Sequence, residues 1–120
     1  MVDVLIVEDD QVTAMELEAM LKERGHRSLA IVSSGEEAIA KVDELEPELL
    51  LVDIRLEGEM SGIEAVEKIQ ETHDIPVIYV TAHSDQDTLR EAQSTKPEGY
   101  LVKPISDEEL DVSIEMVMRE

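Results

Sequence analysis

Five short runs of aliphatic residues alternate along this chain with five longer segments in which apolar residues recur every three or four positions. The short runs, at residues 2–7, 26–32, 49–53, 76–80 and 99–102, are apolar at most positions, which predicts strands covered on both faces of a sheet. The longer segments begin near residues 10, 34, 61, 84 and 106, and their spacing predicts amphipathic helices.

Polar residues mark the ends of these predicted helices. A capping box, in which a Ser hydroxyl and a Glu carboxylate three residues later satisfy each other's backbone N–H groups, is predicted at 34–37, 61–64 and 106–109. Gly25 and Pro47 are expected to end the first two helices. The helix over 84–95 has a thin apolar face, mainly Leu89 and Ala92, so we expect it to be weakly held and to move.

The alternation of strand and helix predicts the fold class. Short connections and right-handed crossovers favour an α/β fold with a three-layer, doubly wound, five-stranded parallel sheet. Periodicity alone does not determine the strand order. At 120 residues, the chain is interpreted as a single domain over residues 1–120.

Composition excludes several classes of function. Thirty acidic and ten basic residues give a formal charge of −20, which repels nucleic acid and anionic membranes, so neither is an expected partner. The absence of cysteine excludes disulfides, thiolate metal sites and cysteine nucleophiles. Without a signal peptide or a run of membrane-spanning length, a cytoplasmic protein is expected. Phe and Trp are absent, so the core is predicted to consist of Val, Ile, Leu, Met and Ala.

Polar residues end four of the five strands, where the carboxyl ends of parallel strands meet at one edge and ligands bind. These residues are Glu8, Asp9, Asp10, Asp53, Thr81 and Lys103. Neighbouring carboxylates repel unless a cation joins them, and an oxygen-only set suits Mg²⁺. Beside such an ion, Asp53 can act as a nucleophile toward phosphorus, with Lys103 and Thr81 stabilising the transferring oxygens.

Simpler interpretations of these residues remain open. The acids after the first strand are also favoured at a helix N-terminus by the macrodipole. Asp53 read alone suits a loop cap at a strand end, and Lys103 read alone suits a solvated lysine.

Four motifs together resemble the receiver domain of two-component response regulators, including chemotaxis regulators. They are IVEDD at 6–10, LVD at 51–53, VTA at 80–82 and GYLVKP at 99–104. The resemblance extends over about residues 2–118. It implies a flavodoxin-like strand order, 2-1-3-4-5, and a phosphorelay in which a sensor histidine kinase or a histidine phosphotransfer protein donates a phosphoryl group to Asp53.

The resemblance also implies roles for the acidic residues. Glu8 and Asp9 match the acidic pair of the family, with Asp9 and Asp53 binding Mg²⁺ directly. The backbone carbonyl of Arg55 would supply a further ligand. Asp10 lies one place beyond the pair and is expected to cap the first helix.

The remaining implied roles concern the switch. Thr81 and Lys103 would hold the phosphoryl oxygens, and the Lys103–Pro104 peptide is expected to be cis. Tyr100 matches an aromatic side chain that turns inward when Thr81 moves, and Ala82 leaves room for it; simple core filling by Tyr100 is the alternative. The fourth helix, fifth strand and last helix would then carry the change to a downstream effector or a fused output domain.

Two departures from the family pattern affect the expectations. The loop at 54–61 is one residue longer than the commonest form and lacks its usual proline. Arg55 and His83 occupy places that flank the path of the hydrolytic water, so they are candidates for tuning the lifetime of the phosphorylated form. An exposed loop histidine is the simpler interpretation of His83.

The resemblance implies a signalling domain with only weak intrinsic phosphotransfer and autodephosphorylation, to which two other functions are alternatives. An Mg²⁺-dependent phosphohydrolase that forms an aspartyl phosphate generally needs a second acid two residues after the nucleophile, where this chain has Arg55. The other alternative is a receiver-like interaction module that works without phosphorylation. Loss of an acid, Asp53, Thr81 or Lys103 would favour it, but all of these residues are present. Val112 and Met116 lie off the inward face of the last helix and suggest a homodimer.

Overall fold

The computed structural model describes residues 1–56, 58–82 and 86–119, with the side chains of residues 86 and 87 left out. Its strands are β1 (Asp3–Val7), β2 (Arg27–Val32), β3 (Leu49–Asp53), β4 (Val77–Thr81) and β5 (Gly99–Val102). Its helices are α1 (Gln11–Glu23), α2 (Gly35–Leu45), α3 (Gly62–Gln70), α4 (Gln86–Gln93) and α5 (Asp107–Met118). The bounds differ from the predicted ones by one or two residues at most ends.

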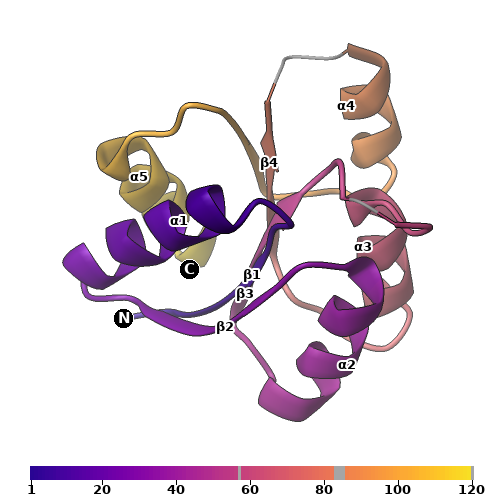
Figure 1. Ribbon diagram of the computed structural model, residues 1–120, viewed down its shortest axis with the longest axis horizontal. Coiled ribbons are helices and arrows are strands. Elements are labelled where there is room, and N and C mark those ends of the chain that lie inside the picture. The colour runs from indigo at the N-terminus through magenta and orange to yellow at the C-terminus, as the bar shows by residue number, and fades with distance from the viewer. Residues whose placement is uncertain (57, 83–85, 120) are drawn as a thin grey trace.

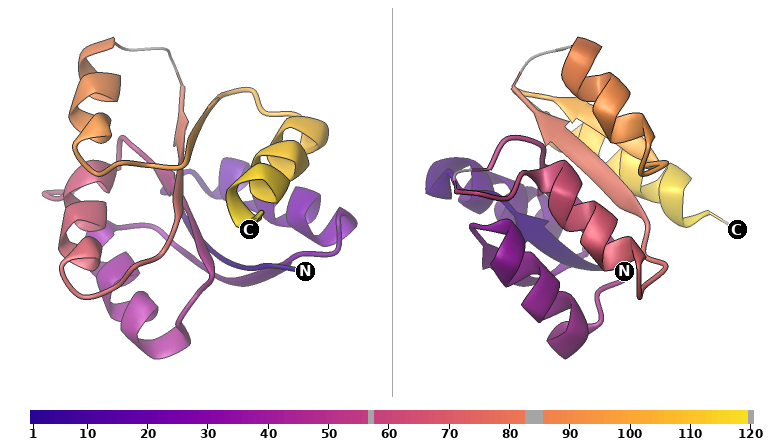
Figure 2. Two further views of the ribbon diagram at one scale, coloured as in Figure 1. Left: turned by 180° about the vertical axis from the view of Figure 1, so that it is seen from behind. Right: turned by 90° about the vertical axis from the view of Figure 1, so that its right-hand side faces the viewer.

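The strands form one parallel sheet in the order β2-β1-β3-β4-β5. Helices α1 and α5 cover one face, and α2, α3 and α4 cover the other (Figures 1 and 2). The predicted three-layer fold and the strand order implied by the resemblance are both confirmed.

Burial explains why β3 is apolar throughout. All five of its residues are buried. Leu50 and Val52 belong to the core cluster beneath α2, α3 and α4, whereas Leu49 and Leu51 belong to the cluster beneath α1 and α5. A central strand with helices on both faces has no side that contacts water.

The prediction of a purely aliphatic core is wrong at Tyr79. This side chain is fully buried in β4. Its hydroxyl lies 2.8 Å from Oγ1 of Thr95, which is also buried. A buried tyrosine is tolerated when its polar end finds such a partner.

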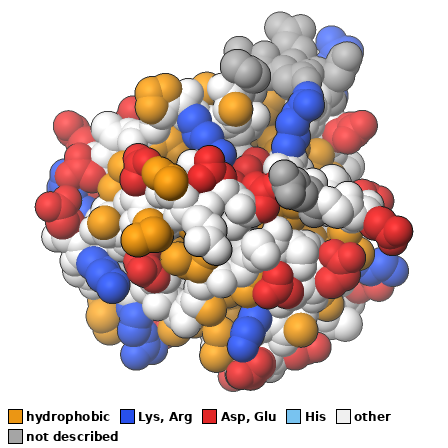
Figure 3. Space-filling view, in the orientation of Figure 1, with side chains coloured by type: hydrophobic (Ala, Val, Ile, Leu, Met, Phe, Trp, Pro, Cys, Tyr) orange, Lys and Arg blue, Asp and Glu red, His pale blue; other side chains and the backbone are white. Residues whose placement is uncertain are grey.

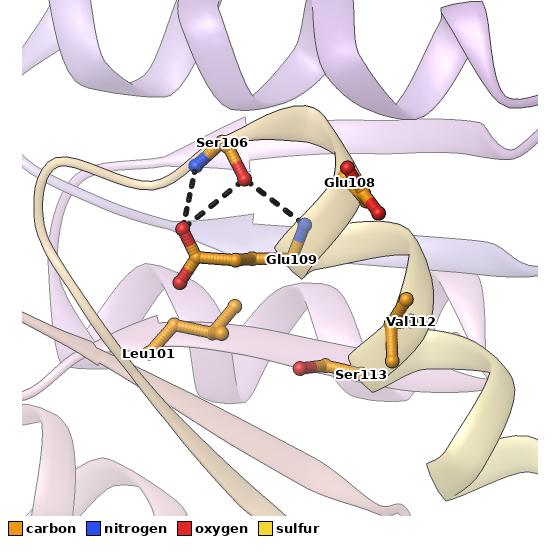
Figure 4. A pocket seen from close by; sticks show the side chains of 6 residues that line it. All are labelled: Leu101, Ser106, Glu108, Glu109, Val112 and Ser113. Carbon is orange, nitrogen blue, oxygen red and sulfur yellow. Dashed lines mark hydrogen bonds between the residues drawn. The ribbon is translucent and has the colours of Figure 1, made fainter.

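The predicted capping boxes at α3 and α5 are confirmed. In each, the Ser hydroxyl accepts from the Glu N–H and the Glu carboxylate accepts from the Ser N–H. Figure 4 shows this arrangement for Ser106 and Glu109 at the start of α5. These two helices therefore begin where local sequence predicts.

The predicted box at α2 is only half formed. The Ser34 hydroxyl accepts from the Glu37 N–H at 3.2 Å. The Glu37 carboxylate instead accepts the hydroxyls of Ser33, at 2.9 Å, and Ser34, at 3.2 Å. The hydroxyl of Ser33 competes for the carboxylate, so the reciprocal bond to the Ser34 backbone is not made.

Helix α4 has the thin apolar face predicted for it. Among its described side chains, Ala92 is buried and Leu89 is half-buried against the core. Ser84, where the helix was expected to begin, lies outside the described residues.

The charge is distributed over the surface. Acidic side chains are spread across the face drawn in Figure 3, with fewer basic ones between them. Within the described ranges, the structure has no helix that is both long and apolar enough to cross a bilayer.

Candidate functional site

The carboxyl ends of β1, β3, β4 and β5 surround a pocket of about 350 Å³. Strands β1 and β3 are neighbours in the sheet, at the point where the order of the chain reverses, and such points are the usual ligand sites of doubly wound sheets. The residues that line the pocket are Glu8, Asp9, Asp10, Asp53, Arg55, Thr81, Ala82 and Lys103. The polar strand ends predicted to meet do so.

A lysine bridges two of the carboxylates in this pocket. Lys103 Nζ lies 2.8 Å from Glu8 Oε1 and 3.3 Å from Asp53 Oδ2. The contact with Asp53 is a hydrogen bond, and the contact with Glu8 is a close ion pair. Lys103 is therefore held by the site and is not a freely solvated lysine.

Glu8 is the most buried of the four carboxylates that line the pocket, with 2% of its surface exposed. Its pKa is raised from 4.5 to about 7, first because burial penalises the charged form and second because the Asp53 carboxyl lies beside it. The Lys103 ammonium and the Asp10 N–H, which donates to Glu8 Oε2 at 3.1 Å, act in the opposite direction. Glu8 therefore exchanges a proton near neutral pH.

The positive charge of Lys103 is stabilised by the Glu8 and Asp53 carboxylates. Burial lowers the pKa of Lys103, but the Glu8 and Asp53 carboxylates outweigh it, so the net direction is upward. The ammonium therefore stays protonated at neutral pH.

The pocket fits a hard divalent cation. Glu8, Asp9 and Asp53 each offer a carboxylate oxygen, and these oxygens all lie within 4.8 Å of one another. Glu8 Oε1 is buried, and the Lys103 ammonium lies 2.8 Å from it. Mg²⁺ takes oxygen ligands and keeps several waters, which a pocket of this size accommodates.

The backbone around Asp53 is held on both sides. The Arg55 N–H donates to Asp53 Oδ1 at 3.0 Å, and the Ile54 N–H donates to the Val80 carbonyl at 3.2 Å. Gly62 packs directly against this segment, because a Cβ atom there would collide with the Asp53 carbonyl oxygen. A residue without a side chain is therefore required where α3 begins.

Thr81 and Ala82 lie at the end of β4 beside the carboxylates. Thr81 is buried, and its carbonyl accepts from the Lys103 N–H at 2.7 Å. Ala82 is exposed and lines the pocket. The Lys103–Pro104 peptide is cis, as the resemblance implied.

Two of the predicted residues lie away from this pocket. Tyr100 is 37% exposed on β5, so it does not simply fill the core. Pro104 is exposed and lines a neighbouring pocket of about 320 Å³ between α1 and residues 103–105.

The two candidates for tuning the lifetime of the phosphorylated form are Arg55 and His83. Arg55 is exposed and donates from its guanidinium to Thr88 Oγ1 of α4 at 3.5 Å. His83 lies outside the described residues. Asp10 caps α1 as predicted, accepting from the N–H groups of Val12 and Thr13.

Sequence reasoning did not assign a role to Tyr79. The structure joins its hydroxyl to Thr95 and stacks its ring on Tyr100, with centroids 6.2 Å apart. The available signal was its place two residues before Thr81 in one strand, which puts both side chains on the same face.

Known proteins resemble this chain over nearly its whole length. The pattern of the response regulator receiver domain matches residues 4–115. The transcriptional regulatory protein AfsQ1 of Streptomyces coelicolor is 33% identical over 119 residues, which is 99% of this chain and 52% of AfsQ1. PdtaR of Mycobacterium tuberculosis is 31% identical over 115 residues, which is 96% of this chain and 56% of PdtaR. The chain thus spans about half the length of these two regulators.

A solved structure agrees with these relatives. The signal receiver domain of a modulated diguanylate cyclase from Desulfovibrio desulfuricans G20 superposes with a TM-score of 0.93 at 36% identity, covering 98% of this chain and 94% of that one. Receiver domains are signalling domains of two-component systems that switch on phosphorylation and interact with histidine kinases and output domains. This chain belongs to the response regulator receiver domain family.

Proposed function

We propose that this chain is a switch in which Asp53 accepts a phosphoryl group from the phosphohistidine of a sensor kinase or of a histidine phosphotransfer protein. The observation that carries the proposal is the convergence of the Lys103 ammonium on the Asp53 and Glu8 carboxylates, 3.3 and 2.8 Å away. A cation beside a carboxylate at the mouth of a pocket allows a dianionic group to approach a negatively charged site.

In the transfer step, an Asp53 carboxylate oxygen forms a bond to phosphorus while the N–P bond of the phosphohistidine breaks. The donor nitrogen keeps the bonding electron pair. Asp53 Oδ1 is oriented by the Arg55 N–H at 3.0 Å, and Oδ2 accepts from Lys103. Fixed donors of this kind position the nucleophile and need little rearrangement during transfer.

Glu8, Asp9 and Asp53, with the Arg55 backbone carbonyl, would hold Mg²⁺. When bound, this ion neutralises charge on the transferring oxygens. Asp10 is assigned no part in binding it, because its carboxylate is engaged in capping α1.

The phosphoryl group would then shift a conformational equilibrium. It adds about −1.5 to −2 charges and several strong acceptors, toward which Thr81 and Lys103 can turn. A shift from 1:99 to 99:1 needs about 5.5 kcal/mol of preference for one state, and two or three charge-assisted hydrogen bonds of about 1.5–3 kcal/mol each supply that amount. Tyr100, which is exposed in the structure, would turn inward as Thr81 moves.

The surface that carries the change to a partner would comprise α4, β5 and α5. Its exposed apolar side chains are Tyr100, Val102, Val112 and Met116. Val112 also lines, together with Leu101 and Ser113, a shallow pocket of about 350 Å³ at the junction of β5 and α5 (Figure 4). A downstream effector, a fused output domain or a second copy of the chain would bind there.

A phosphohydrolase is less well supported. The place of the second acid is taken by Arg55, which is exposed and whose guanidinium reaches toward α4. A phosphorylation-independent module is disfavoured because the acids, Thr81 and Lys103 all line one pocket.

Labelling with a small acyl phosphate tests the proposal. The protein is incubated with acetyl phosphate and Mg²⁺, and its intact mass and peptide map are measured. One base-labile phosphoryl group on Asp53 is expected, and none in Asp53→Asn or after chelation of the metal. Asp10→Asn, which keeps a good helix cap, should retain the modification. Labelling that persists in Asp53→Asn would refute the assignment.

Sedimentation tests the dimer separately. The wild type and Met116→Glu are compared with and without beryllofluoride and Mg²⁺, because a charge on the α5 surface should prevent a second copy from packing there. A wild-type monomer under both conditions would remove the dimer from the proposal.

A further inference from the structure

Tyr79 connects the strand that carries Thr81 with the layer that contains α4. Residues two apart in a strand point to the same face, so Tyr79 and Thr81 both face this layer. Tyr79 is fully buried and belongs to the same core cluster as Ala92 of α4.

The Tyr79 hydroxyl belongs to a directed chain of hydrogen bonds. The Thr95 hydroxyl donates to the Ala92 carbonyl at 2.6 Å, which uses its single hydrogen. Tyr79 is therefore the donor in its 2.8 Å bond with Thr95 Oγ1. The Thr95 carbonyl also accepts from Gln70 Nε2 at 2.6 Å, so Thr95, two residues after α4 ends, ties this end of the helix to both β4 and α3.

The Tyr79 hydroxyl is a donor at neutral pH, since the ordinary pKa of tyrosine, 10, already lies well above it, and burial raises the pKa of Tyr79 further, to about 12. The tie matters for α4 because this helix buries little apolar surface. Ala92 and, two residues after the helix ends, Thr95 are buried, whereas Thr88 and Leu89, nearer the start of the helix, are only half-buried. Among the described side chains, burial is therefore deepest at the C-terminal end of α4.

The Tyr79 ring also contacts the residue proposed to turn. Tyr79 and Tyr100 are paired in adjacent strands, with ring centroids 6.2 Å apart and an interplanar angle of 28°. A movement of Tyr100 therefore changes the packing against the side chain that holds the end of α4.

We propose that Tyr79 is a positioning residue of the switch, whose hydroxyl anchors the C-terminal end of α4 so that the helix pivots about Thr95 when Tyr100 turns. This inference rests on the proposed function, because the pivot requires that a phosphoryl group at Asp53 moves Thr81 and Tyr100. The anchor itself does not depend on phosphorylation and is tested separately.

Amide hydrogen exchange of the metal-free protein, followed by NMR, tests the anchor. Tyr79→Phe and Thr95→Val each remove one hydroxyl and keep the shape of the side chain. Exchange at residues 92–96 is expected to become about fivefold faster, the size expected for one net hydrogen bond. The control is Thr72→Val, which removes an exposed hydroxyl that contacts His73 and should leave these amides unchanged. Unchanged exchange in Tyr79→Phe overturns the anchor.

Chemical-shift changes on adding beryllofluoride and Mg²⁺ test the pivot, and a merely structural role of Tyr79 would not alter their distribution. In the wild type, the changes should be large at residues 88–91 and small at 92–96. In Tyr79→Phe, they should extend through 92–96. The same distribution in both proteins, or equal changes along the whole helix in the wild type, overturns the pivot. The absence of any change at Asp53 and Thr81 in the wild type overturns the proposed function instead, and the pivot with it.

Discussion

Replacing Glu8 with Gln is expected to stabilise the metal-free protein at pH 8 but not at pH 5. Glu8 is buried, and burial together with the adjacent Asp53 carboxyl raises its pKa from 4.5 to about 7. The folded protein therefore keeps a proton on Glu8 between these two pH values, whereas the unfolded chain releases it. Because the pKa is raised on folding, the contribution of this group is most favourable below pH 4.5 and is lost as the pH rises to about 7.

The magnitude follows from the interval of about 2.5 between the two pKa values. At about 1.4 kcal/mol per pKa unit, ionised Glu8 lowers the free energy of unfolding by at most about 3.5 kcal/mol. The glutamine side chain of the variant can still accept from the Asp10 N–H, but it loses the ion pair with Lys103, so a net gain of about 1–3 kcal/mol is expected at pH 8. At pH 5, the two proteins should be nearly equal.

Urea unfolding in the presence of a chelator, at pH 5, 6, 7 and 8, measures this difference. Glu67→Gln is the matched control, since it removes one charge from the same −20 chain at an exposed position on α3. Its effect should vary little with pH. A Glu8→Gln difference that is the same at pH 5 and pH 8, or that matches the control, would refute the assignment of a proton to Glu8.

Addition of Mg²⁺ should reverse the order of stability. The ion competes with the proton for Glu8, so wild-type affinity for Mg²⁺ should rise between pH 6 and pH 8. In Glu8→Gln, the affinity should be weaker and nearly independent of pH over this range.

Three further predictions concern the surroundings of the site. Gly62→Ala should destabilise the fold by about 1–3 kcal/mol in urea unfolding and reduce labelling of Asp53 by acetyl phosphate, because the new Cβ collides with the Asp53 carbonyl oxygen; Gly99→Ala, where the nearest atom would be 3.8 Å away, should retain full labelling. Lys103→Gln should weaken beryllofluoride binding about 10- to 100-fold in an NMR titration, as expected for loss of a charge-assisted hydrogen bond; unchanged affinity would argue against its role. Ser106→Ala should cost about 1 kcal/mol in urea unfolding through loss of the α5 cap without reducing labelling.

The local sequence was sufficient for features that depend on neighbouring residues. Asp10 and Ser106 predicted helix starts because a cap bonds to backbone only two or three residues away. The segment Leu49–Asp53 predicted a buried strand because four consecutive aliphatic residues leave no polar side to face water. Strand ends also predicted which polar residues would meet, since parallel strands bring their carboxyl ends to one edge. At α2, the sequence pattern of a capping box is present, but only one of its two hydrogen bonds forms because the Ser33 hydroxyl binds the Glu37 carboxylate.

Only the tertiary structure decided how these groups interact. Lys103 and Asp53 are 50 residues apart, and no local pattern predicts that one ammonium bridges Asp53 and Glu8. The raised pKa of Glu8 has the same origin, because desolvation depends on everything packed around a side chain. The predicted core of Val, Ile, Leu, Met and Ala left tyrosine out, yet Tyr79 is fully buried, and Thr95, 16 residues later, supplies an acceptor for its hydroxyl. Residue order determines which groups reach the edge of the sheet, and packing determines their charge, orientation and partners.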